Sequence, residues 1–141
     1  MLYHPTPRIT QENREYFDAC SEGKLLGQRC TRCGKIHCPP AGMCACSLSA
    51  EFESVHLVGT GAIYTFSVIH RPPGPEFSEQ VPYVLGVVEL DEGPRLVSNI
   101  VELDPSEIEI GLRVAVRFEP CADNLILVPV FAPEMKHGSR T

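Results

Sequence analysis

Five of the seven cysteines fall within residues 28–52, a stretch with almost no large apolar side chains. Such a stretch cannot bury enough apolar surface to fold by hydrophobic packing alone, so another interaction must hold it. Disulfides would suit a secreted protein, but residues 1–10 show no recognisable signal peptide. We therefore expect a cytoplasmic protein in which a bound metal ion folds these residues.

The spacing of four of these cysteines is typical of a structural zinc site. Cys30 and Cys33 form a C-x-x-C pair that Gly34 follows, which is the pattern of a zinc knuckle. Cys44 and Cys46 follow as a C-x-C pair. Four thiolates would complete a tetrahedral zinc site with no open coordination position, so the pattern predicts a structural metal and not a catalytic one.

The second pair leaves alternatives open, because one intervening residue makes a tighter chelate than two. Cys38 or His37 could replace Cys44 or Cys46 as a ligand. The alternative to any metal site is a set of unpaired cysteines in a cytosolic loop. The two cysteines outside this stretch, Cys20 and Cys121, are most simply explained as small buried apolar residues.

The rest of the chain is mainly β. Thr10 can cap a short helix over residues 11–22, with Gly23 as its stop. After residue 52 the apolar side chains alternate with the two-residue period of half-buried strands. Gly86 suggests a bulge or a bend, and Pro129 suggests an edge position. The predicted strands cover residues 61–70, 81–91, 95–102, 112–119 and 125–131, with a short helix at 104–107 between the third and the fourth.

Five strands with one helical insertion at that point are typical of an OB-fold barrel. The sequence thus predicts a mainly β protein with an N-terminal helical segment, a rubredoxin-like zinc ribbon, a five-stranded OB-fold barrel and a mobile tail. The corresponding residues are 1–27, 28–52, 53–135 and 136–141.

Charge and hydropathy narrow the classes of function. The formal net charge is −6, which opposes the counterion release that favours nucleic-acid binding. No apolar run reaches the length needed to span a bilayer. We therefore expect neither a nucleic-acid partner nor a membrane.

Several segments together resemble a known family. The chain is similar to zinc-ribbon and OB-fold proteins that are associated with acyl-CoA enzymes and were long known only as a domain of unknown function. The similarity covers about residues 14–133. The segments that carry it are residues 16–26, 30–34, 39–40, the second cysteine pair, 59–68, 70–72, 82–84, 88–93, 99–101 and 110–114. This chain departs from the family where Cys44-Ala45-Cys46 stands for a second C-x-x-C, and where Cys38 stands for an aromatic residue before two prolines.

The resemblance implies an accessory role. Members pair with thiolases, with thiolase-like aldolases or with hotdog-fold hydratases, and they complete an acyl-CoA site or pass intermediates between enzymes. For this chain it implies a hetero-oligomer with structural zinc and with coenzyme A or acyl-CoA as a shared ligand. A fold-level analogy of this kind fixes neither the partner nor the substrate.

The residues themselves also argue against independent catalysis. A thiolase-type reaction needs an activated cysteine with a histidine as base. Neither Cys20 nor Cys121 lies beside a histidine in the sequence, and His70 is next to Arg71, which disfavours its protonated form. The nucleophile must then come from a partner.

Two segments are candidates for binding. Lys24, Arg29, Arg32 and Lys35 lie within twelve residues that contain no acidic side chain, and they could contact the phosphates of CoA or could form an ordinary solvated face. Residues 70–77 are rich in proline. They predict an extended arm with Phe77 as an interface residue, or else a disordered hairpin loop.

The sequence therefore favours a non-catalytic zinc-binding subunit that partners a thiolase and helps to form or gate its acyl-CoA site. One alternative is an accessory subunit of a hotdog-fold hydratase or a thiolase-like aldolase. A single-stranded nucleic-acid-binding module and an independent zinc hydrolase or redox protein are further alternatives.

Overall fold

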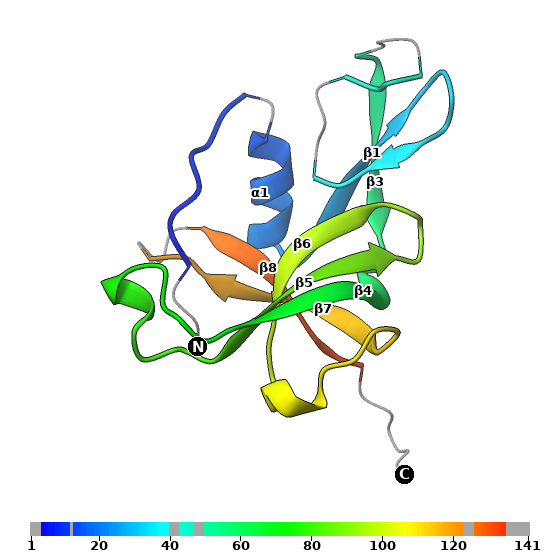
Figure 1. Ribbon diagram of the computed structural model, residues 1–141. Coiled ribbons are helices and arrows are strands. Elements are labelled where there is room, and N and C mark those ends of the chain that lie inside the picture. The colour runs from blue at the N-terminus through cyan, green and yellow to red at the C-terminus, as the bar shows by residue number, and fades with distance from the viewer. Residues whose placement is uncertain (1–3, 12, 40–42, 47–49, 123–125, 135–141) are drawn as a thin grey trace.

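The computed structural model describes residues 4–11, 13–39, 43–46, 50–122 and 126–134. Within these residues the chain forms a short helix, a small three-stranded sheet and a closed five-stranded barrel (Figure 1). The helix and the small sheet stand next to each other at one end of the barrel. The mainly β fold and the five-stranded barrel are confirmed, whereas the predicted mobile tail, residues 136–141, lies outside the described residues.

Helix α1 (Arg14–Ser21) is shorter than the predicted helix over residues 11–22. Thr10 and Asn13 form the reciprocal pair of a capping box just before it: the Thr10 amide donates to Asn13 Oδ1 at 2.7 Å, and the Asn13 amide donates to Thr10 Oγ1 at 3.3 Å. The chain leaves the helix at Gly23, whose φ of +79° suits a glycine at this point. The buried face of α1 consists of Tyr16, Ala19 and Cys20.

The small sheet has the order β2-β1-β3 and is antiparallel throughout. Its strands are β1 (Leu25–Cys30), β2 (Ile36–His37) and β3 (Phe52–Leu57). It starts before the predicted boundary at residue 28 and ends after the one at residue 52, because β3 pairs with β1 along its whole length. The alternating pattern of residues 52–57 therefore belongs to this sheet and not to the barrel.

The barrel has the strand order β4-β5-β6-β8-β7. Its strands are β4 (Thr60–Ile69), β5 (Tyr83–Leu90), β6 (Arg95–Ile100), β7 (Arg113–Pro120) and β8 (Leu127–Pro133), each within two residues of the predicted strand. The 3₁₀ turn η2 (Pro105–Glu107) lies between β6 and β7, where a helical insertion is predicted. Side chains that fill the barrel include Ile63, Val84, Val88, Leu90, Val114 and Phe131.

The predicted bulge at Gly86 is wrong. Gly86 pairs in register with Phe66 and Ser98, and a Cβ there would lie 3.0 Å from the Ile100 side chain, so the glycine makes room for core packing. The irregularity is on β4, between Ile63 and Thr65. It lies at Tyr64. The Arg95 guanidinium packs over the exposed ring of Tyr64, with 3.8 Å between Arg95 Cζ and the ring centroid.

The predicted extended arm is also wrong. Its residues fold into the 3₁₀ turn η1 (Pro75–Phe77), where the Phe77 amide donates to the Gly74 carbonyl at 3.0 Å. The ring of Phe77 packs on Tyr83 with 6.1 Å between centroids. The prolines therefore shape a turn that folds back towards β5.

A two-residue joint, Val58 and Gly59, connects the small sheet to the barrel. The Val58 amide donates to Glu92 Oε2 at 2.9 Å, and the Gly59 carbonyl accepts from the Val116 amide at 2.8 Å. Buried residues of α1, of the sheet base and of the barrel also form one continuous cluster. The position of the small sheet on the barrel is thus held by hydrogen bonds and by a shared core.

Among the described residues, no helix has both the length and the apolar character needed to cross a bilayer.

We predict that Gly59→Ala destabilises the joint. The φ of Gly59 is +90°, and an added Cβ would meet Val116 Cγ1 at 2.5 Å. Gly111 is the matched control, because its φ is +92° and nothing lies within 4 Å of the added atom. Urea unfolding should show a loss of about 1–2 kcal/mol for Gly111→Ala and of about 2–5 kcal/mol for Gly59→Ala. Equal losses would show that the contact with Val116 is unimportant.

We also predict an acid-sensitive contribution from Asp91. Hydrogen bonds from Arg113 and Thr60 lower the pKa of this carboxyl group from 3.8 to about 2. A lowered pKa in the folded state means that the stabilisation is complete above the unfolded pKa and is lost as the pH falls from about 4 to about 2. The difference in unfolding free energy between wild type and Asp91→Asn should therefore shrink over that interval. A difference that stays constant from pH 6 to pH 2 would contradict this prediction.

Candidate functional site

The structure brings Cys30, Cys33, Cys44 and Cys46 together at the end of the small sheet that is remote from the barrel. All four sulfur atoms lie within 4.8 Å of one another. The distances between Sγ atoms are 3.7 Å for Cys30 and Cys46 and 3.5 Å for Cys33 and Cys44. Cys30 and Cys44 are buried, whereas Cys33 and Cys46 are exposed.

The backbone of the first turn, residues 30–35, is arranged around the sulfur atoms of Cys30 and Cys33. The Gly34 amide donates to the Cys30 carbonyl at 2.8 Å, and Gly34 has a φ of +81°. The Lys35 amide points at Cys33 Sγ from 3.4 Å. A hydrogen bond from the backbone of Cys33 is the largest of the effects that lower the pKa of Cys30 to about 6. The turn therefore favours thiolate at Cys30, the form in which cysteine binds metals.

These residues fit a tetrahedral zinc ion. Sulfur atoms that each lie about 2.3 Å from a tetrahedral zinc are about 3.8 Å from one another. The two short distances, 3.5 and 3.7 Å, are close to this value although the second pair is C-x-C. Four sulfur ligands leave no coordination position for a substrate, so zinc here would act as a structural crosslink.

The two alternative ligands lie elsewhere. Cys38 Sγ is buried and donates to the Leu26 carbonyl at 3.5 Å. The His37 ring stacks edge-on against Phe52, with 5.7 Å between ring centroids. Its Nε2 is buried and has no hydrogen-bond partner among the described residues. Neither residue belongs to the four-sulfur cluster.

The remaining thiols are poorly suited to nucleophilic chemistry. Cys20, Cys38 and Cys121 are buried. Burial raises the pKa of both Cys20 and Cys38 to about 12, so these two stay protonated at neutral pH. His70 is exposed beyond the end of β4.

Three of the four basic residues proposed to contact CoA phosphates lie near carboxylates. Arg29 is 3.1 Å from Glu53, Arg32 is 3.8 Å from Glu51, and Lys24 is 4.0 Å from Glu22. Among the described residues, Lys35 forms no ion pair within 4 Å. Glu53 lies in β3, and Glu51 comes directly before that strand. These carboxylates approach Arg29 and Arg32 because β3 pairs with β1, so the sequence alone does not show that the two arginines are neutralised.

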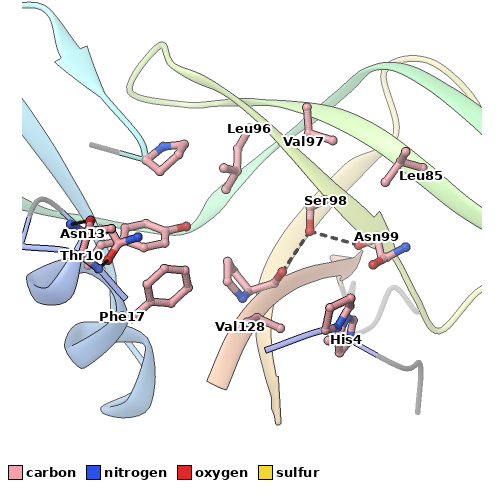
Figure 2. Close-up of a pocket in the computed structure, with 14 residues that line it drawn as sticks. His4, Thr10, Asn13, Phe17, Leu85, Leu96, Val97, Ser98, Asn99 and Val128 are labelled. Carbon is pink, nitrogen blue, oxygen red and sulfur yellow. Dashed lines mark hydrogen bonds between the residues drawn. The ribbon is translucent and has the colours of Figure 1, made fainter. Parts of the chain in front are cut away.

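A pocket of about 530 Å³ lies where α1 and the N-terminal residues meet strands β6 and β8 (Figure 2). Strands β6 and β8 pair in parallel at Ile100 and Phe131, and the pocket opens beside this contact. Phe17, Leu96 and Val128 provide apolar walls, and Ser98 Oγ donates to the Pro129 carbonyl at 3.1 Å.

No Asp, Glu, Lys or Arg is among the described lining residues of the pocket. His4 lies at its edge, with Nε2 2.8 Å from Glu119 Oε1. No sequence pattern indicates this pocket, because residues from five separate segments form it: 4–17, 39, 85, 96–99 and 128–129. Its chemistry suits an apolar or neutral polar group better than a phosphate.

Comparison with known proteins decides the family. Residues 17–53 match the family described as ChsH2, rubredoxin-like zinc ribbon domain, and residues 54–119 match ChsH2, C-terminal OB-fold domain. A DUF35 domain-containing scaffold protein of Methanothermobacter thermautotrophicus is 40% identical over 78% of this chain and 83% of that protein. This chain belongs to the DUF35 family. The zinc-ribbon and OB-fold predictions are confirmed.

Other relatives of this DUF35 chain differ in length. A probable enoyl-CoA hydratase alpha subunit of Thermomonospora curvata is 40% identical over 92% of the chain, but the chain spans only 40% of that protein. The benzoylsuccinyl-CoA thiolase subunit BbsA of Thauera aromatica is 28% identical over 89% of this chain and 87% of that subunit. A solved structure entitled Ltp2-ChsH2(DUF35) aldolase contains a chain with 38% identity and a TM-score of 0.79. The match covers 91% of this chain and 98% of that one.

We predict that the DUF35 cluster binds about one zinc ion per chain. Cys33→Ser should lose the metal, because this exposed residue supplies one of the four sulfur atoms. Cys38→Ser is the matched control and should keep the metal, because Cys38 lies outside the cluster. Metal analysis of the purified, reduced variants provides the measurement. Zinc retained in Cys33→Ser and lost in Cys38→Ser would move the ligand assignment to Cys38.

Proposed function

We propose that this chain is a non-catalytic, zinc-stabilised subunit of an acyl-CoA-processing complex, with a thiolase-type enzyme as its preferred partner. The partner would catalyse the cleavage or condensation of a 3-ketoacyl-CoA. The observation that carries the proposal is that four cysteines converge in a cluster suited to structural zinc, while the other three are buried.

The distribution of sulfur argues against a catalyst. Acyl transfer by cysteine needs a thiolate that a base activates and that substrate can reach. Cys20 and Cys38 are buried thiols with raised pKa values, and the cluster leaves no open position on a metal. The nucleophile would therefore come from the partner.

The share of each relative that this chain matches supports a thiolase-type enzyme as the partner. The chain matches nearly the full length of BbsA, which is named as a thiolase subunit, and of the DUF35 chain in the aldolase structure. It matches well under half of the hydratase alpha subunit, so that name has less weight for this chain. A thiolase-like aldolase is the runner-up, and a hydratase is a weaker alternative.

Two surfaces are candidates for contact with acyl-CoA. The pocket between α1, β6 and β8, which has no Asp, Glu, Lys or Arg among its described lining residues, would suit the acyl or pantetheine part and not the phosphates. Lys24, Arg29, Arg32 and Lys35 stay candidates for the phosphates. Lys35 is the best of these four because no carboxylate of the described residues is paired with it.

We predict that the isolated, zinc-loaded chain does not cleave 3-ketoacyl-CoA. Co-expression with the thiolase-type subunit encoded nearest to it should give a complex of the two chains with thiolysis activity. Cys33→Ser should abolish this complex, and Cys38→Ser should preserve it. The measurements are size-exclusion chromatography and a thiolysis assay. Thiolysis at an enzyme-like rate by the isolated chain would overturn the assignment.

A further inference from the structure

We propose that the four-cysteine cluster is also a redox-responsive metal site, which peroxide converts into two crossed disulfides, Cys30–Cys46 and Cys33–Cys44, with release of the metal. This response goes beyond the proposed function as a non-catalytic subunit. It depends on zinc occupancy and not on the identity of the partner.

All four sulfur atoms lie within 4.8 Å of one another, and both proposed pairs are close within this cluster. The Sγ atoms of Cys30 and Cys46 are 3.7 Å apart, and those of Cys33 and Cys44 are 3.5 Å apart. Each pair joins a cysteine of the first turn, which holds Cys30 and Cys33, to a cysteine of the second turn, which holds Cys44 and Cys46. Modest movement of the two turns would bring each pair to the bonding distance of about 2.05 Å.

Exposure gives the two members of each pair different roles. Cys33 and Cys46 are exposed, so a small oxidant in solution reaches them first. Cys30 and Cys44 are buried. In the zinc-loaded site all four sulfur atoms would be thiolates. Each pair would then combine an accessible thiolate with a resolving thiolate, the arrangement in which a sulfenic acid is converted to a disulfide before it can be oxidised further.

The chemistry balances with hydrogen peroxide as the oxidant. The exposed thiolate attacks one peroxide oxygen, the O–O bond breaks, and a sulfenic acid and hydroxide form. The buried thiolate then attacks the sulfenic sulfur and expels a second hydroxide. Four thiolates, two molecules of hydrogen peroxide and four protons thereby give two disulfides and four molecules of water. Disulfide sulfur lacks the thiolate charge that binds zinc, so the site loses its affinity for the metal.

The crossed pairing has a structural consequence that the alternative pairing lacks. Cys30–Cys46 and Cys33–Cys44 each tie the first turn to the second, as the metal would. Disulfides within the turns, Cys30–Cys33 and Cys44–Cys46, would leave the two turns unconnected. Crossed disulfides would therefore keep the ribbon closed after the metal has left, and reduction in the presence of zinc would restore the original site.

Disulfide mapping of the full-length, zinc-loaded chain tests the proposal. The reduced protein is treated anaerobically with rising amounts of hydrogen peroxide, released zinc is measured with a chromogenic chelator, and remaining thiols are alkylated. Trypsin cleaves after Arg29, Arg32 and Lys35, so Cys30 and Cys33 lie on separate tripeptides and Cys44 and Cys46 lie on the peptide that begins at Ile36. Fragmentation of that peptide between residues 44 and 46 assigns each partner.

We expect zinc release to be complete at about two molecules of peroxide per chain, the ratio set by two disulfides. Each tripeptide should be linked to the peptide that begins at Ile36, and Cys20, Cys38 and Cys121 should be alkylated. Cys38→Ser should give the same map. A link between the two tripeptides, sulfinic or sulfonic acids in place of disulfides, or zinc retained after oxidation would overturn the proposal. Zinc content measured before oxidation tests the metal site separately, so the two failures can be distinguished.

Discussion

The attraction between the four proposed thiolate ligands and a zinc ion is the interaction on which we propose that the tip of the zinc ribbon depends. At the base of the ribbon, Leu25, Leu26 and Leu57 belong to the core shared with α1 and the barrel. At its tip, the buried side chains among the described residues are Cys30 and Cys44, two of the proposed ligands. Hydrophobic burial therefore stabilises the base, whereas the tip relies on sulfur and metal.

The joint to the barrel fixes where this tip stands. The Val58 amide donates a hydrogen bond to Glu92, and the Gly59 carbonyl accepts one from the Val116 amide. Both residues of the connection are therefore fixed to the barrel. On the adjacent strand ends, Asp91 accepts hydrogen bonds from Thr60 and Arg113. A metal-stabilised tip on a fixed joint gives a preorganised surface, and preorganisation reduces the entropic cost of binding a partner.

Local patterns along the chain account for most of the fold. The two-residue period predicts five barrel strands within two residues of their observed ends, because alternating burial is a local property of a strand. The cysteine spacing likewise predicts the four residues that converge. The bulge at Tyr64, the neutralising carboxylates Glu51 and Glu53, and the pocket beside Ser98 depend on which strands become neighbours. The spacing of residues along the chain does not contain that information.

The most direct test of this metal dependence is hydrogen exchange of the reduced chain with and without its metal. Removal of zinc by a chelator should increase exchange at the ribbon amides, including those of Cys30 and Gly34, and should leave β5 in the barrel protected. If the ribbon amides kept the same protection after the metal was shown to be absent, hydrophobic packing would suffice to fold the tip. That result would contradict the claim that sulfur and metal hold the ribbon together.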